Sequence, residues 1–157
     1  MNNWTKRRRS GFSLLELVIV IVIMGIVAAV AIPRMSRGSA GASDAALGSN
    51  LSALRTAVDL YASEHGGAYP AAATFSNQMT LYTSTTGATN ATKTSTYLYG
   101  PYLRKVPTLP VGPEKGSSTV AASAATGVGW VYTAASGDIQ ANTGTLKDAA
   151  DKLYTAY

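Results

Sequence analysis

The feature that most constrains this chain is an apolar run of 21 residues, 12–32, that is interrupted by a single charge, Glu16. As a helix rising about 1.5 Å per residue, the run is about 32 Å long, which matches the roughly 30 Å hydrocarbon core of a bilayer. The sequence therefore predicts a helix that can span a membrane. A carboxylate at the centre of such a helix costs at least about 2.5 kcal/mol, and less near the surface, so we expect Glu16 to have a partner.

A basic leader precedes the run. Residues 6–9 are all lysine or arginine, four of the 13 in the chain, and only Arg34 and Arg37 follow the run closely. Positive charge marks the cytoplasmic side, so we expect the N-terminus to be cytoplasmic. Without the leader, nine basic side chains stand against eight acidic ones. The net charge of +5 is therefore mostly a topology signal, and we expect no nucleic-acid partner.

The junction of leader and run, GFSLLEL at residues 11–17, resembles the processing signature of type IV pilins and type II secretion pseudopilins. The resemblance implies that a prepilin peptidase cleaves after Gly11 and methylates the new amino group of Phe12. It also implies that Glu16 pairs with the N-terminus of an adjacent subunit during assembly. After cleavage, the Phe12 amine would lie one helical turn before Glu16 and supply the opposite charge.

The resemblance implies a structural subunit of a homo-oligomeric filament rather than an enzyme. The precursor would be held in the inner membrane by a single span, with its C-terminal part in the periplasm, and then extracted into the filament. The implied partners are the prepilin peptidase, an inner-membrane assembly platform and minor pilins. A secretion pseudopilus, a surface pilus and a DNA-uptake fibre remain alternatives at this point.

Two other interpretations of the apolar run are open. Residues 29–31 satisfy the A-x-A rule, so cleavage after Ala31 would release a soluble binding protein or enzyme. However, the run exceeds the usual 7 to 15 residues of a signal peptide, and a glutamate has no purpose there. A plain membrane anchor explains the hydrophobicity but neither Gly11 nor Glu16.

A second helical pattern follows the membrane run. Large side chains recur at alternating spacings of four and three, which places them on one helix face: Leu47, Leu51, Leu54, Val58 and Tyr61. We predict one long helix from about Phe12 to His65, with a transmembrane and assembly part at 12–33 and an amphipathic part at 34–66. Gly66 and Gly67 are expected to end it, because glycine accepts the C-cap conformation.

Two residues weaken the first part of this helix. Pro33 lacks an amide hydrogen and crowds the carbonyl of Ala29, which predicts a kink or local unwinding. Gly25 lowers helix propensity by about 1 kcal/mol relative to alanine.

Residues 67–157 are predicted to form a β-rich globular part. With the long helix packed on a small antiparallel sheet with long loops, the expected fold is α+β and pilin-like. Residues 83–96 predict a polar loop, residues 97–103 a strand-like patch, and residues 129–133 and 139–142 a hairpin. Thr145-x-x-Asp148 predicts a capping box that opens a last short helix.

Residues 65–70 and 100–107 and the Trp130 hairpin resemble the major pseudopilins of the type II secretion G class. That resemblance implies calcium in a C-terminal loop. Here Glu114 stands in the corresponding segment, 113–116, and Asp138 is the only acid of the hairpin, whereas calcium needs six to eight oxygens. We therefore expect no cofactor. The chain has no cysteine, unlike the many type IV pilins that carry a C-terminal disulfide, and this favours a pseudopilin or another cysteine-free variant.

Little in the sequence suggests catalysis. His65 is the sole histidine, and a cation at a helix C-terminus suits the helix dipole, so we predict a capping role for it. The chain has no histidine or cysteine cluster for a metal and no nucleophile-elbow motif. Its nine tyrosines are expected to bury their rings in the small sheet rather than stack on single-stranded DNA.

Overall fold

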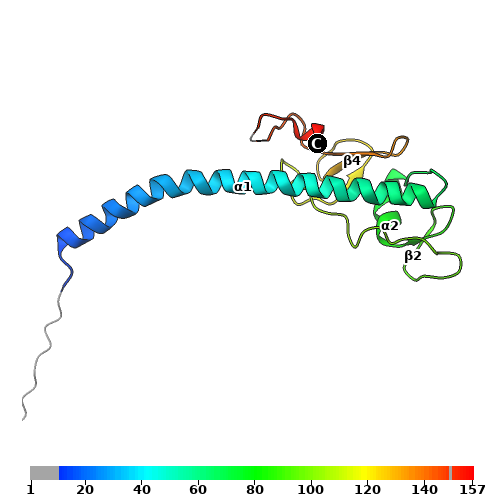
Figure 1. The fold of residues 1–157 in the computed structure, drawn as a ribbon, viewed down its shortest axis with the longest axis horizontal. Helices are drawn as coiled ribbons and strands as arrows, with labels where there is room; N and C mark the ends of the chain where they lie inside the picture. The colour runs from blue at the N-terminus through cyan, green and yellow to red at the C-terminus, as the bar shows by residue number, and fades with distance from the viewer. Residues whose placement is uncertain (1–10, 149) are drawn as a thin grey trace, which may run out of the picture. The chain divides into compact units, whose positions relative to one another are not determined.

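The first element among the described residues is a single long helix. The computed structural model describes residues 11–148 and 150–157, with the side chains of 32–37 left out, so the basic residues of the leader lie outside it. Helix α1 runs over Leu14–Glu64, close to the predicted 12–65 (Figure 1). The helix continues through Pro33, whose side chain is not described, and the kink between Gly25 and Pro33 stays a prediction.

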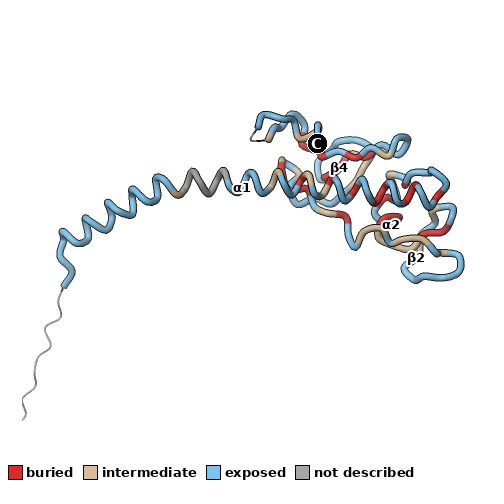
Figure 2. Tube along the Cα trace, viewed as in Figure 1, coloured by how far each residue is buried: buried red, intermediate tan, exposed pale blue. Residues whose placement is uncertain are grey.

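The chain divides into two compact units, the first ending at Gly38 and the second covering Ser39–Tyr157. In the second unit, the five large side chains predicted to share one face of α1 are at most 3% exposed (Figure 2). We call them the seam of α1: Leu47, Leu51, Leu54, Val58 and Tyr61. They form one hydrophobic core with residues from the rest of that unit, chiefly Phe75, Met79, Leu109, Trp130, Tyr132 and Ile139. Full burial of such a side chain contributes about 1.5–3 kcal/mol, so the seam fixes how α1 is held in this unit.

The C-terminal end of α1 has the predicted glycine cap. Gly66 and Gly67 have φ angles of 65° and 88°, a region that residues with a Cβ avoid. The Gly67 amide donates to the Ala62 carbonyl oxygen over 2.8 Å, which satisfies one of the carbonyls left open at a helix end.

Two short helices that the sequence analysis did not predict follow α1. They are the 3-10 turn η1, Ala72–Thr74, and α2, Phe75–Thr80. Phe75 and Met79 are one turn apart and both are buried in the core. Six residues are too few for a periodic pattern to stand out, which explains why this helix was missed.

Two small sheets complete the second unit. Strands β1, Tyr82–Thr83, and β2, Thr89–Asn90, pair antiparallel. Strand β4, Trp130–Thr133, pairs antiparallel with β5, Asp138–Ala141, which confirms the predicted hairpin. On its other side β4 pairs parallel with β3, Val120–Ala121, so this sheet is mixed rather than purely antiparallel.

The buried aromatic residues of β4 satisfy their polar groups on loop backbone. The Trp130 indole Nε1 donates to the Pro107 carbonyl over 2.8 Å, and the Tyr132 hydroxyl donates to that of Pro70 over 3.0 Å. The tyrosine prediction is thus confirmed for Tyr132, whose ring is fully buried.

The strand-like patch predicted at 97–103 is wrong except for one bridge, between Thr83 and Tyr99. The capping box predicted at Thr145 and Asp148 is also wrong. Asp148 Oδ1 instead accepts the amides of Ala150 and Lys152, each within 2.9 Å, which folds the chain into a turn. The last short helix is a 3-10 turn, η2, Tyr154–Ala156.

Candidate processing and assembly site

Gly11 and Phe12 lie just ahead of α1 and are both exposed. The Phe12 side chain is 86% exposed, and Leu14 is the first helical residue. A Cβ added at Gly11 would meet no other atom within 4 Å. Among the described residues, no packing contact therefore requires glycine at this position. Gly11, Phe12 and Ser13 thus form an exposed segment without helix or strand, which a peptidase could reach.

Ser13 and Glu16 form a capping box at the start of α1. The Ser13 hydroxyl accepts the amide of Leu15 over 3.3 Å, and Glu16 Oε2 accepts the amide of Ser13 over 2.9 Å. The first intrahelical bond runs from the Leu17 amide to the Ser13 carbonyl over 3.2 Å. Such boxes satisfy amides that a helix start leaves open, and the negative charge of Glu16 suits the positive end of the helix dipole.

The sequence analysis missed this second role of Glu16, although its signal is visible. Ser13-x-x-Glu16 is a capping-box pattern directly before an apolar run. The pattern overlaps the processing signature, which gives Glu16 an intermolecular partner instead. Both roles are compatible, because an ionised carboxylate has two oxygens and accepts several hydrogen bonds.

The helix after the box exposes its apolar side chains. Residues Leu14–Ala31 have a mean hydropathy of 3.0, and none of them is buried. The large side chains from Leu14 to Val30 are 41–80% exposed (Figure 2). By length and composition this helix can cross a membrane, as predicted. Its uncovered apolar surface also suits contact with copies of itself.

The two acids of the implied calcium region, Glu114 and Asp138, take part in hydrogen bonds of the fold. Among the described residues there is no group of three or more histidines, cysteines or acids that could hold a metal. Glu114 Oε2 already accepts the Gly127 amide over 2.7 Å. Asp138 accepts the Ser136 hydroxyl over 2.6 Å within the hairpin turn.

The Asn142 side chain donates hydrogen bonds to two carbonyls of the loop that also contains Gly127. Its Nδ2 donates to the carbonyls of Ala125 and Val128 over 3.1 and 2.8 Å. Backbone carbonyls are ligands that calcium uses, and here an amide occupies them. The loop is thus held by protein hydrogen bonds from Glu114 and Asn142.

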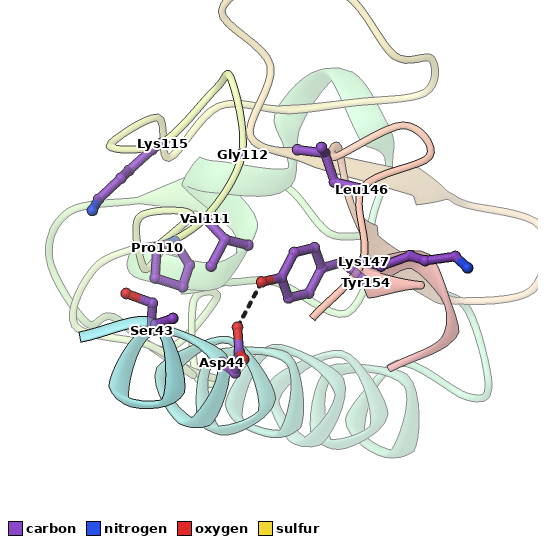
Figure 3. A pocket seen from close by; sticks show the side chains of 10 residues that line it. Ser43, Asp44, Pro110, Val111, Gly112, Lys115, Leu146, Lys147 and Tyr154 are labelled. Carbon is purple, nitrogen blue, oxygen red and sulfur yellow. Dashed lines mark hydrogen bonds between the residues drawn. The ribbon is translucent and has the colours of Figure 1, made fainter. Parts of the chain in front are cut away.

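A shallow concavity of about 320 Å³ lies between α1 and the C-terminal segment of the second unit. In it the Tyr154 hydroxyl donates to Asp44 Oδ1 over 2.6 Å, while Lys115 and Lys147 point away (Figure 3). The hydrogen bond to Asp44 raises the pKa of Tyr154 to about 12, so the tyrosine stays neutral. Arg55 Nη1 also donates to the Tyr157 carbonyl over 2.7 Å. These contacts fasten the C-terminal segment to α1 and imply no chemistry.

The comparisons with known proteins bear on the N-terminal segment alone. Residues 6–32 match the family model described as the prokaryotic N-terminal methylation motif. No curated protein and no solved structure matches the chain significantly. The matched segment contains the junction, the capping box and the apolar run. It points to a structural protein with a processed N-terminus.

Proposed function

Because the methylation motif and the apolar helix fit a type IV pilin or pseudopilin, we propose that this chain is a filament subunit processed after Gly11. The observation that carries the proposal is the junction itself. An exposed Gly11-Phe12 bond stands directly before a capped helix whose apolar side chains are uncovered. Cleavage there leaves Phe12 as the N-terminal residue and the membrane helix intact. Cleavage after Ala31 would remove that helix from the product.

The assembly step uses the same residues. The processed subunit stays in the inner membrane, with its N-terminus cytoplasmic and its second unit periplasmic, until the assembly platform and minor pilins draw it into a filament. There the helices pack against one another in place of lipid. Glu16 pairs with the Phe12 amine of a neighbour, and in that low-dielectric bundle the attraction sets the axial register.

Within the wider class, we propose a pseudopilin of the G class or a close variant. Residues 65–70 and 100–107 and the Trp130 hairpin support this assignment, as does the absence of cysteine from the sequence. The C-terminal segment is held to α1 by the contacts of Tyr154 with Asp44 and of Tyr157 with Arg55.

Mass spectrometry of the mature protein tests the processing step. We expect a chain that begins at Phe12 and carries one N-methyl group, because the peptidase acts at an exposed junction that the fold leaves free. Co-expression with an inactive peptidase is the control, and it should yield only the full-length precursor. A mature terminus at Ile32 would overturn the filament proposal and favour a secreted soluble protein.

We also propose that the subunit folds without calcium. A ligand that binds the folded state raises the melting temperature. We therefore expect the same thermal unfolding curve with a chelator and with millimolar calcium. Asn142→Ala should destabilise the subunit by about 0.5–1.5 kcal/mol in both buffers, because it removes the donor of the part-buried Val128 carbonyl. A melting temperature that rises with calcium would contradict this proposal and leave the processing proposal untouched.

A further inference from the structure

The chain contains two Asn-x-Ser/Thr motifs, the pattern to which N-linked sugars are attached. The first covers residues 50–52, within α1, and the second covers residues 90–92 and begins at the last residue of β2. The side-chain nitrogen of the asparagine forms the bond to the sugar, so a modified asparagine needs an accessible nitrogen that the fold does not already use. The two motifs differ in this respect.

The motif in α1 is held by the fold. Asn50 Nδ2 donates to the Thr108 carbonyl oxygen over 3.0 Å, which fixes the side chain against a loop 58 residues later in the chain. A helix also bonds each amide to the carbonyl four residues earlier, so the amide of Ser52 is not available to the Asn50 side chain. We therefore expect Asn50 to stay unmodified.

The second motif lies at an open edge of the second unit. Among the described strands, β2 pairs with β1 alone, and residues 91–96 after it are all exposed (Figure 2). Asn90 is partly exposed, and its Oδ1 accepts the amide of Thr92 over 2.8 Å. No hydrogen bond among the described residues involves Asn90 Nδ2 or the Thr92 hydroxyl. The two side-chain groups that define the motif are thus both available to an enzyme.

The hydrogen bond to Asn90 Oδ1 favours reaction at Nδ2. An amide nitrogen is a weak nucleophile, because its lone pair is delocalised into the carbonyl group. When Nδ2 gives up a proton, negative charge develops on Oδ1, and a hydrogen bond to that oxygen stabilises the charge. The Thr92 amide supplies this hydrogen bond in the folded subunit.

We propose that Asn90 is a glycosylation site, modified by a transferase that uses a lipid-linked oligosaccharide diphosphate. A bond forms between Asn90 Nδ2 and the anomeric carbon of the first sugar. The bond from that carbon to the diphosphate oxygen breaks, the lipid diphosphate leaves with the electron pair, and a proton from Nδ2 passes to a base of the transferase. The proposal rests on the proposed function only in placing the second unit outside the cytoplasm, where such transferases act.

Peptide mass spectrometry of the mature protein, purified from the cells that normally produce it, tests the site. We expect the Asn90 peptide to carry the mass of an oligosaccharide in most copies, and the Asn50 peptide to carry none. The added mass should survive mild base, which removes sugars from serine and threonine but not from asparagine. An unmodified Asn90, or added mass that mild base removes, would overturn the proposal. Equal modification of Asn50 would also overturn it, because the motif alone would then decide.

Variants at the two motifs test the requirement for each side chain. Asn90→Gln should lose all of the added mass, because it removes the acceptor. Thr92→Ala should lose it as well, whereas Thr92→Ser keeps the hydroxyl of the motif and should retain the mass. Asn50→Gln is the matched control and should leave the added mass unchanged. Added mass that persists in Asn90→Gln or in Thr92→Ala would show that the assignment is wrong.

The same spectra separate this inference from the proposed function, because they also give the N-terminal residue. A chain that begins at Phe12 with an unmodified Asn90 would reject the glycosylation site and leave the filament proposal intact. A chain that begins at Ile32 with an oligosaccharide on Asn90 would reject the filament proposal and support the glycosylation site.

Discussion

Gly11→Val is expected to leave the leader attached to nearly all of the protein. The branched side chain would stand directly before the scissile bond, where a peptidase that accepts glycine has no room for it. The subunit itself offers no explanation for such a loss, because a Cβ at Gly11 meets no atom within 4 Å. On an immunoblot of membrane fractions, the precursor would migrate more slowly than the mature protein.

Gly25→Val is the matched control for this experiment. Gly25 lies in the same apolar segment, and a Cβ there also meets nothing within 4 Å. We expect this variant to be processed to normal length, since it lies well away from the junction. The assignment of Gly11 as the cleavage site would be wrong if Gly11→Val yielded protein of mature length. It would also be wrong if neither variant were cleaved.

Glu16→Val is expected to insert into the membrane at least as well as the wild type, yet to form almost no filaments. Valine removes a charge that is unfavourable in lipid, which explains normal insertion. In the proposed filament, the same change leaves the neighbour's Phe12 amine without a partner in the helix bundle. Breaking a buried ion pair costs about 3–5 kcal/mol, which corresponds to a more than about hundredfold loss of assembly. The amount of the protein in the membrane fraction checks insertion, and the yield of sheared filaments checks assembly.

The capping box requires a second variant, because Glu16→Val also removes the acceptor of the Ser13 amide. Glu16→Gln keeps an oxygen for that amide but loses the charge. We expect it to fail in assembly as well, since the proposed intermolecular pair depends on charge. Filaments at wild-type yield from Glu16→Gln would assign the role of Glu16 to the helix start alone.

Sequence periodicity predicted the parts of the fold that repeat over many residues. The seam of α1 spans four turns, so its spacing could not be accidental, and all of its members are buried. The hairpin was also predictable, because β-branched and aromatic residues flank a polar turn. The end of α1 was predictable as well, because glycine, unlike residues with a Cβ, easily adopts the positive φ that Gly66 and Gly67 have.

The missed elements are short, and tertiary contacts decide them. Strands β1, β2 and β3 have two residues each, which no period can reveal. Asp148 was predicted as a helix cap from its spacing to Thr145. In the structure its carboxylate also accepts the Tyr157 hydroxyl, a contact that local pattern does not encode. Of the candidate site, the signature gave Gly11, Phe12 and Glu16. The capping box of Ser13 and Glu16 was recognised only in the structure, although its spacing is visible in the sequence.

The fastening of the C-terminal segment has a consequence for the order of folding. Asp44 and Arg55 contact residues 110 and 102 positions later in the chain, and the seam of α1 meets a hairpin that begins at Trp130. A chain made from its N-terminus therefore carries an unpaired apolar seam until most of its length has been synthesised. Closing so long a loop adds little entropy cost over a shorter one, but it slows the search for native contacts. Folding of the second unit is thus a late event, because the seam of α1 stays uncovered until the hairpin and the C-terminal segment have been made.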